Sequence, residues 1–452
     1  MVIKILQQRG FTIVELLIVV VVIAILAAIT IVAYNGITRA AAESSLKSDL
    51  RNSAQLVEKT KEESGTSLYP ATSAEATLAQ SPGSTVTYLK KPYGYCIAGV
   101  NPKTNKTFAI RSVSKKIEEG TCDVTVTTLA GTNTSGYTDG TGTAARFAGP
   151  SGVAAANDGT VYVSDTSNNR IRKISTDGTV SFVSGTGASG SVNSTAAASQ
   201  YNQPGKLTFD TSGNLYVVEG SRNTVRKVNA STGDSTAYAG TSAVCNFGRG
   251  SFTDGDMTNA RLDGPSSIAT DNSGVSYIAE NRSNRIRAVQ TDGSVSTYAG
   301  SGALNSCVAS SADAGSANGS RLSASFSSPQ SIVIDNSGVL YIGDSGNNAI
   351  RTISTGGVVG SLISSLGSNQ LPRSMVIDSQ GTIYSASNYG VFSITPSGTI
   401  ALVAGSNTVF GFVNGSATTA RFNIINDISF NADQTALFVA DSQNHSIRKI
   451  SL

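Results

Sequence analysis

One sequence pattern recurs six times between residue 123 and residue 452, and it constrains the fold more than any local feature does. Five copies carry a short apolar run that ends in an acid, as in Val161-Tyr162-Val163-Ser164-Asp165. A second run follows, as in Ile171-Arg172-Lys173-Ile174, and most copies add a further run that ends in glycine. Asp-Gly and Asn-Gly pairs separate the runs, as expected of tight turns. Four short strands per copy predict an all-β six-bladed propeller over residues 123–452.

The repeated motif resembles that of the NHL-repeat family, whose blades carry the Tyr-Val-x-Asp … Asn-x-Ile-Arg-Lys run found here at 162–173. The sixth copy lacks an outer strand, whereas residues 123–131 look like an outer strand that belongs to no copy of its own. Pairing these residues with the sixth copy would close the ring and leave no open sheet edge. We therefore expect 123–131 to complete the last blade.

Acidic and arginine positions vary together in the repeats. In five copies an acid stands three residues after the aromatic position, and an arginine stands seven residues beyond the acid; the fifth copy has Ser387 and Phe392 instead. Joint loss favours an ion pair across the strand hairpin, because removing one partner would leave the other charge buried. A ring of arginines for a polyanion would explain the arginines but not the acids. The predicted pairs are Asp165–Arg172, Glu219–Arg226, Glu280–Arg287, Asp344–Arg351 and Asp441–Arg448.

A second constraint lies near the N-terminus, where Glu15 is the only charged side chain between Phe11 and Ala33. A helix of about 23 residues is long enough to cross a bilayer core of roughly 30 Å. Lys4 and Arg9 precede this run, and cationic flanks remain on the cytoplasmic side. We therefore expect one helix to anchor the chain in the inner membrane and the C-terminal part to be exported.

The small residue Gly10 precedes the apolar run, whereas the cut site of an ordinary secretory signal follows it. The order Gly10, Phe11, Thr12, Glu15 resembles the prepilin signal of type IV pilins and pseudopilins. The resemblance implies cleavage after Gly10, N-methylation of Phe11, and a filament in which Glu15 meets the methylated amine of a neighbouring subunit. An intramembrane acid is costly unless it is paired. The simpler alternative is a plain anchor whose Glu15 reaches the membrane interface.

These observations divide the chain into a leader at 1–10, a transmembrane and assembly helix at 11–63, a small head at 64–122 and the propeller at 123–452. Strand-like runs in the head predict a small antiparallel sheet. A long helix followed by such a sheet is what an α+β pilin-like module looks like.

Four cysteines allow three pairings, and an exported chain favours disulfides. We favour a bridge between Cys96 and Cys122 within the head, where a closed loop of about 26 residues would stabilise the fold by roughly 3 kcal/mol. Cys245 and Cys307 stand in two neighbouring long loops, so a second disulfide between them is plausible.

Few residues suggest catalysis. His445 is the single histidine and stands in a turn of the sixth copy, where a structural role is expected. One histidine with scattered cysteines cannot make the usual zinc sites, and no Gly-x-Ser-x-Gly elbow with a histidine partner is present. The net charge of +3 is too small to argue for nucleic acid. We therefore expect no enzyme, no metal, no cofactor and no nucleic-acid partner.

The long inter-blade loops should gather on one face of the ring, and the join at 366–372 is much shorter than the others. This leaves a notch beside the fifth blade, where Tyr389 and Phe392 are candidate ligand contacts. A propeller on every subunit would crowd a filament. The sequence therefore predicts a minor, tip-located pilin-like subunit whose extracellular propeller serves adhesion or ligand binding.

The expected partners are other pilin subunits, a prepilin peptidase and methylase, and a surface glycan or protein. One alternative is a pseudopilin of a type II secretion or DNA-uptake system. Another is a surface-displayed propeller enzyme, a lyase or hydrolase.

Overall fold

The structure is a computed structural model. It describes residues 13–63, 69–70, 72, 75–76, 78–91, 94–104, 106–111, 117–119, 122–241, 252–257, 259–301, 314–367 and 370–452. The chain divides into two compact units, Met1–Cys122 and Asp123–Leu452.

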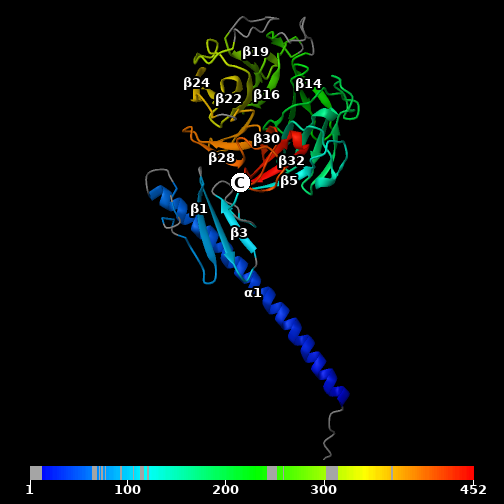
Figure 1. The fold of residues 1–452 in the computed structure, drawn as a ribbon, viewed down its shortest axis with the longest axis vertical. Helices are drawn as coiled ribbons and strands as arrows, with labels where there is room; N and C mark the ends of the chain where they lie inside the picture. The colour runs from blue at the N-terminus through cyan, green and yellow to red at the C-terminus, as the bar shows by residue number, and fades with distance from the viewer. Residues whose placement is uncertain are drawn as a thin grey trace, which may run out of the picture. The chain divides into compact units, whose positions relative to one another are not determined.

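The first unit is built on one long helix, α1 (Ile13–Glu63, 51 residues), drawn in blue in Figure 1. The described large apolar side chains between Leu17 and Ile37 are 47–72% exposed. By length and composition, α1 is the one described helix that could cross a membrane; its most apolar window has a mean hydropathy of 2.5 and none of it is buried. This half of α1 thus presents an apolar surface that no described residue covers.

The C-terminal half of α1 packs on an antiparallel sheet. Leu46, Leu50 and Val57 recur at helical spacing, share one face of the helix and are fully buried. A Cβ atom on Gly99 would lie 2.6 Å from Cδ1 of Leu46, so glycine lets the helix approach the sheet this closely. The strands, in spatial order, are β1 (Thr85–Lys91), β2 (Gly94–Asn101), β3 (Lys106–Arg111) and β4 (Ile117–Glu119).

A disulfide links Cys96 of β2 to Cys122, with their Cα atoms 5.7 Å apart. Both residues are buried and pack with Ala109 of β3. The bridge ties the last residue of the first unit to the middle of its sheet.

In the part of the second unit that the structure describes, the strands form six antiparallel sheets. We number them from first to sixth along the chain. The first runs outward from β7 (Gly152–Ala155) through β8 (Val161–Asp165), β9 (Arg170–Ile174) and β10 (Thr179–Ser184) to β6 (Gly140–Thr141). The second comprises β11 (Leu207–Phe209), β12 (Leu215–Glu219), β13 (Thr224–Val228) and β14 (Ser235–Ala239). The third comprises β16 (Pro265–Thr270), β17 (Ser276–Glu280), β18 (Arg285–Val289), β19 (Ser294–Ala299) and β15 (Gly255–Asp256).

The remaining three sheets repeat this order. The fourth comprises β21 (Pro329–Ile334), β22 (Leu340–Asp344), β23 (Ala349–Ile353), β24 (Val358–Ile363) and β20 (Gly319–Ser320). The fifth comprises β25 (Ser374–Ile377), β26 (Ile383–Ala386), β27 (Gly390–Ile394) and β28 (Ile400–Gly405). The sixth comprises β30 (Ile425–Phe430), β31 (Ala436–Asp441), β32 (Ser446–Ser451), β5 (Thr125–Gly131) and β29 (Gly415–Ser416). Short 3-10 turns are η1 (Gly142–Ala144), η2 (Thr166–Asn168), η4 (Ser345–Asn347) and η5 (Ser442–Asn444).

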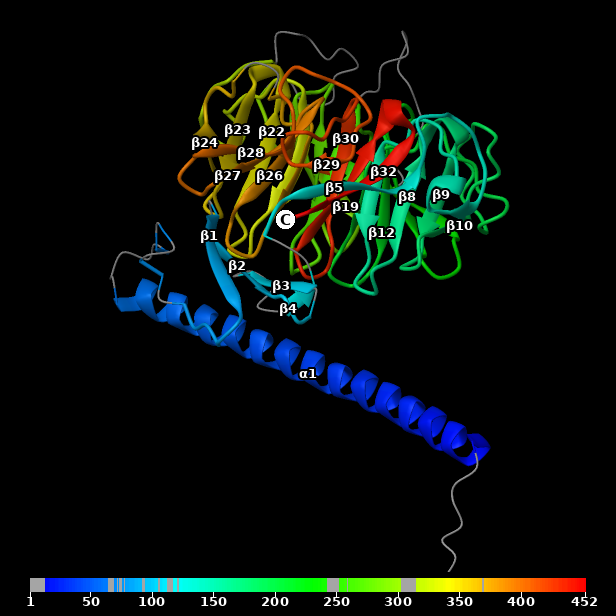
Figure 2. The same cartoon turned by 60° about the horizontal axis from the view of Figure 1, so that its bottom comes forward.

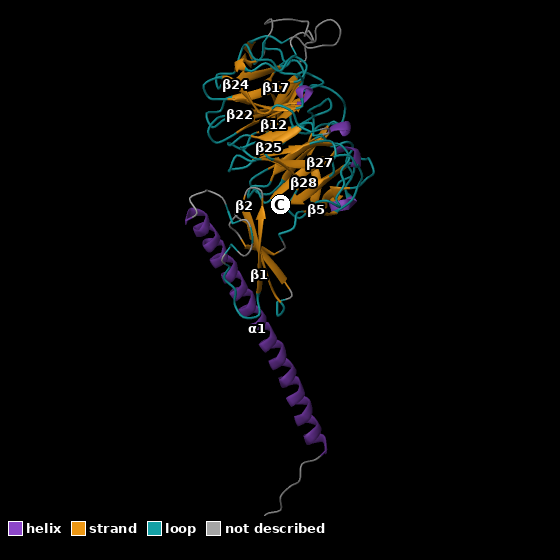
Figure 3. Ribbon diagram, turned by 60° about the vertical axis from the view of Figure 1, so that its left-hand side comes forward, coloured by secondary structure: helices purple, strands orange, loops and turns teal. Residues whose placement is uncertain are grey.

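The six sheets follow one another in a ring. Strand β7 contacts β11, β12 contacts β16, and β16 contacts β21; β25 joins β21 to β30, which contacts β7 again. The strands are linked by loops and turns rather than by long helices, as Figure 3 shows. This cyclic arrangement of antiparallel sheets is propeller-like.

The sixth sheet joins two distant parts of the chain. Strand β5 lies antiparallel to β32, with Val126 opposite Ile450 and Thr127 opposite Lys449. Figure 2 shows the cyan β5 beside the red β32. The outer position of the sixth sheet is therefore filled by residues that precede the other five sheets in sequence.

Candidate functional site

Five arginines of the second unit are buried beside carboxylates. Their side chains are at most 2% exposed, the carboxylates are fully buried, and the closest N–O distances are 2.5–3.3 Å. Each pair spans the hairpin between the second and third strands of its sheet. The pairs are Asp165–Arg172, Glu219–Arg226, Glu280–Arg287, Asp344–Arg351 and Asp441–Arg448.

All five arginines also hold the loop that leads into their own sheet, and Arg226 does so by donating to the carbonyl oxygen of Val192 at 3.0 Å. Arg172 donates to the carbonyl oxygens of Thr138 and Arg146 and pairs with Asp139, and its guanidinium lies 4.8 Å from the ring of Phe147. These contacts occupy the guanidinium within its own sheet and leave it inaccessible to a polyanion. Equivalent loop contacts join Arg287 to Asp254, Arg351 to Asn318 and Arg448 to Asn414.

The fifth sheet lacks this arrangement because the chain enters it by the short join at 366–372. Phe392 lies opposite Ser385, at the register position that arginine holds elsewhere, and is 3% exposed. Ser387 replaces the acid and its hydroxyl donates to the carbonyl of Gly390. Without a long loop, a guanidinium here would have no loop carbonyls to bind. The prediction that Phe392 contacts a ligand is wrong, because its ring belongs to the core.

Tyr389 is half-buried beside the exposed Phe410, with ring centroids 5.8 Å apart. Its phenol lies within electrostatic range of the Arg373 guanidinium. Tyr389 therefore remains a residue that a surface ligand could reach.

His445 has a structural partner. The backbone N–H of Gly149 donates to its Nδ1 at 3.0 Å, which places the ring proton of the neutral form on Nε2. The contact joins the sixth sheet to the loop that leads into the first. Burial lowers the pKa of His445, since the charged imidazolium would lose solvation and could not accept this hydrogen bond. Asparagine makes the equivalent contact elsewhere, at Asn169, Asn223 and Asn284.

Several predicted site residues lie outside the described residues: Gly10, Phe11, Cys245 and Cys307. Glu15 falls within α1, where only its helical backbone is described. Among the described residues, no group of three or more histidine, cysteine, aspartate or glutamate side chains is placed to hold a metal ion.

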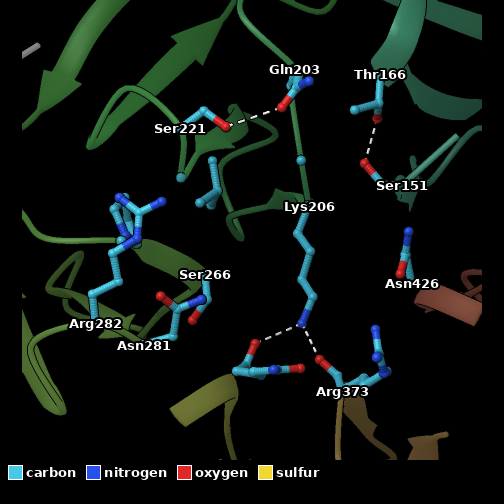
Figure 4. Close-up of a pocket in the computed structure, with 16 residues that line it drawn as sticks. Ser151, Thr166, Gln203, Lys206, Ser221, Ser266, Asn281, Arg282, Arg373 and Asn426 are labelled. Atoms are coloured by element: carbon cyan, nitrogen blue, oxygen red, sulfur yellow. Dashed lines mark hydrogen bonds between the residues drawn. The ribbon is translucent and has the colours of Figure 1, made fainter. Parts of the chain in front are cut away.

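The innermost strands of the six sheets surround a central channel. A cavity of about 370 Å³, here called the channel mouth, opens at one end of this channel. Its walls come from residues at the start of the innermost strands and from turns that follow the second strands. Most lining side chains are hydroxyls or amides, and three are cationic: Lys206, Arg282 and Arg373 (Figure 4). None of the lining residues is acidic or aromatic. A second cavity, at the other end of the channel, shares Lys206 as a lining residue.

Lys206 forms the floor between the two cavities. Its Nζ donates to the carbonyl oxygens of Gln330, at 2.7 Å, and of Arg373. Burial lowers the pKa of Lys206 to about 8, partly offset by the nearby carboxylate of Asp427, so the ammonium is still mostly protonated at neutral pH. Burial also raises the pKa of Asp427 to about 6, although Lys206 and the N–H of Val153 favour its charged form.

Sequence reasoning missed Lys206 and Asp427. They occupy one structural position, immediately inside the channel, at which the other four sheets carry Gly152, Ser267, Ser331 and Ser374. The sequence signal for these residues was the presence of two charged side chains at a repeat position that is small in the other copies. It could be found only by aligning the innermost strands, whereas the acid and arginine motif lies in the second and third strands.

Arg373 and Arg282 differ from the buried arginines in having no carboxylate partner among the described residues. Arg373 Nε is buried without a hydrogen-bond partner, and desolvation lowers the pKa of its guanidinium. Arg282 is exposed at the rim of the cavity. The channel mouth therefore carries positive charge that the described residues of the protein do not neutralise.

Three protein-family models match parts of the chain. The prokaryotic N-terminal methylation motif matches residues 5–31, the NHL repeat matches 147–174, and the teneurin NHL domain matches 238–354. Teneurin-3 from Danio rerio is 29% identical over 231 residues, which is 47% of this chain and 8% of that protein. Protein SUPPRESSOR OF QUENCHING 1, chloroplastic, from Arabidopsis thaliana is 29% identical over 100 residues, 22% of this chain and 10% of that protein. The chain thus spans a small fraction of either relative.

Solved structures share the fold. A structural genomics protein of unknown function from Bacteroides thetaiotaomicron has a TM-score of 0.54 and 17% identity, over 80% of this chain and 82% of that one. An auxiliary nutrient binding protein from Bacteroides ovatus has a TM-score of 0.52 and 14% identity, over 81% and 90%. At such identities the likeness concerns fold alone. The chain joins a prepilin-type N-terminal methylation motif to an NHL-repeat, propeller-like unit.

Proposed function

We propose that this protein is a minor, tip-located pilin-like subunit that displays a six-bladed propeller outside the cell for adhesion or ligand capture. The observation that carries the proposal is the uncovered apolar half of α1, which coincides with the methylation motif at 5–31. Together they support a membrane-anchored, exported chain. Neighbouring subunits supply the missing cover when their helices pack in a filament core.

Two features support a display role over a place in the filament shaft. The unit that follows Cys122 is much larger than the head, so one copy on every subunit would collide with its neighbours. The sheet β1–β4 serves as the small pilin-like head, and the disulfide Cys96–Cys122 ends it where the second unit begins.

Binding is favoured over catalysis by the chemistry of the channel mouth. It holds polar and cationic side chains but no carboxylate, histidine or cysteine to act as a base or nucleophile. We therefore propose a binding module rather than an enzyme.

The first experiment is mass spectrometry of the N-terminal peptide from filaments sheared off the cell surface. We expect a peptide that begins at N-methylated Phe11. Glu15→Ala should remove the protein from the sheared fraction while leaving it in membranes, with Glu62→Ala at an exposed position near the end of α1 as a matched control. An intact leader in a protein found only in membranes would contradict a pilus subunit.

A second arm separates display from secretion. Deleting 123–452 should leave the processed subunit in filaments but reduce surface attachment of the cells. Unchanged attachment combined with loss of a secreted protein or of DNA uptake would favour a pseudopilin instead.

A further inference from the structure

We propose that the channel mouth binds a carboxylated sugar residue, held by the guanidinium groups of Arg373 and Arg282 above the floor formed by Lys206. The inference rests on the proposed role in ligand capture and names the chemistry of the ligand. It arises from three observations on the cavity: unneutralised cations, a lining rich in hydroxyls and amides, and the lack of aromatic side chains.

The first observation concerns charge. The five repeated arginines of the second unit are held against buried carboxylates, whereas Arg373 and Arg282 have none among the described residues. A planar guanidinium binds a carboxylate through two parallel hydrogen bonds. Nε of Arg373 is buried without a hydrogen-bond partner, as are the Nε atoms of Arg172, Arg287 and Arg448, so what sets Arg373 apart is its lack of a carboxylate. A bound carboxylate would supply the counter-charge that the cavity lacks.

The floor is already neutralised and does not need a ligand charge. The Lys206 ammonium donates two hydrogen bonds to backbone carbonyls and lies within electrostatic range of Asp427. Figure 4 shows its side chain descending through the centre of the cavity, with Arg282 and Arg373 on opposite sides. The excess positive charge therefore belongs to the two arginines at the walls.

The second observation distinguishes a sugar from a peptide. Short hydroxyl and amide side chains line the walls, and they can both donate and accept hydrogen bonds, as the hydroxyls of a sugar ring require. An acidic peptide would present apolar side chains as well, whereas Val218 and Pro265 are the only apolar side chains among the residues that line this cavity. The polar lining residues include Ser151, Thr166, Ser221, Ser266, Asn281 and Asn426.

The third observation argues against nucleic acid. Single-stranded nucleic acid is held by aromatic platforms along an extended basic groove. Here no aromatic side chain lines the cavity, and the cations converge on one concave site of about 370 Å³. That volume is within the range of roughly 300–1,000 Å³ that suits small ligands.

The test uses the full-length protein in detergent micelles and isothermal titration calorimetry. The probes are trigalacturonate and its methyl ester, and 3′-sialyllactose and lactose. We expect at least one acidic probe to bind and its uncharged counterpart to bind about tenfold or more weakly, because the charged hydrogen bonds are lost. The two acidic probes distinguish a uronic acid from a sialic acid as the source of the carboxylate.

Variants locate the binding. Arg373→Gln and Arg282→Gln should each weaken the acidic probe about tenfold, and Arg373→Lys should retain part of the affinity. Arg51→Gln, which removes an exposed arginine from the first unit, is the matched control and should not change it. Thermal melting of each variant verifies that it is folded.

Three results would overturn the inference. They are equal binding of the acid and the ester, wild-type affinity in both glutamine variants, and tighter binding of a single-stranded DNA oligomer than of either sugar acid. Failure of both acidic probes to bind would also refute the ligand class. The display role would survive that failure if deletion of 123–452 still reduced attachment.

Discussion

The second unit places arginine in two opposite settings. In five of its sheets a buried arginine faces a carboxylate and also donates to backbone carbonyls of the incoming loop. At the channel mouth, Arg373 and Arg282 have no carboxylate among the described residues. The same side chain thus serves the fold in one region and remains available to a ligand in the other.

A functional cation within a repeat can be recognised by whether its charge and its partner recur together. A charged residue that recurs in successive copies together with its partner has a structural role that each copy shares. A charged residue that occurs in one copy, without a partner, has no such shared role, and its burial lowers the free energy of unfolding through desolvation. The unpaired arginines of the channel mouth, Arg373 and Arg282, are therefore better functional candidates than the repeated, paired arginines.

The largest effect should follow from removing one member of a buried pair. Arg351→Leu leaves Asp344 buried without its cation and releases the loop held through Asn318. We expect a loss of about 3–5 kcal/mol in the free energy of unfolding, measured by urea denaturation followed by circular dichroism.

The same variant has a defined pH dependence. Desolvation already raises the pKa of Asp344, and losing Arg351 should raise it further. The folded state then binds a proton that the unfolded state does not, so stability falls as pH rises through this range. The defect should be smaller at pH 5 than at pH 8, and an equal defect at both would mean that packing, not charge, causes the loss.

The next effect tests whether the fifth sheet is a viable alternative to the pair. The double variant Asp344→Ser with Arg351→Phe reproduces the residues Ser387 and Phe392 of that sheet. It should recover about 1–3 kcal/mol relative to Arg351→Leu, because no buried charge is left unpaired. Recovery should be incomplete, since the long loop into the fourth sheet loses its anchor. A double variant as unstable as Arg351→Leu would show that the unpaired Asp344 carboxylate contributes nothing to the loss of stability.

Much of this organisation could be predicted from the sequence, because the repeats fix both partners of each pair at constant spacing. The ion pairs and the pairing of 125–131 with the last strand follow from comparing copies with one another. The hydrogen bonds of Arg172 to the backbone carbonyls of Thr138 and Arg146 could not be predicted, since a carbonyl carries no sequence signature. The loop contact with Asp139 did leave a signal, because Asp254, Asn318 and Asn414 make the equivalent contact in other copies.

The placement of Phe392 in the core shows the limit of reading a loop from its length. The short join at 366–372 suggested an open notch, but Phe392, which stands in the place of arginine, is buried in the core of the fifth sheet. Lys206 and Asp427 escaped notice for the opposite reason, because they share a position that is filled by small residues elsewhere and lie far apart in sequence.

A smaller effect concerns the contact between the sixth and first sheets. His445→Ala should cost about 1 kcal/mol, because the N–H of Gly149 loses its acceptor, whereas His445→Asn should retain the contact that Asn169 makes elsewhere. The folded-state pKa of His445 lies below its ordinary value. As pH falls below about 6.5, the unfolded chain takes up the proton first and wild-type stability declines. The asparagine variant should lack this part of the decline; an identical slope would contradict the assignment.

The smallest change in stability should come from the unpaired cation. Arg373→Gln removes a partly desolvated charge that has no carboxylate to leave behind, so we expect the free energy of unfolding to change by no more than about 0.5 kcal/mol, or to rise. Urea denaturation of this variant and of Arg351→Leu compares the contributions of the unpaired and the paired arginine to the free energy of unfolding. A loss of several kcal/mol on replacing Arg373 would show that its guanidinium supports the fold as the buried arginines do, and the channel mouth would then lose its distinction as a site kept ready for an anionic ligand.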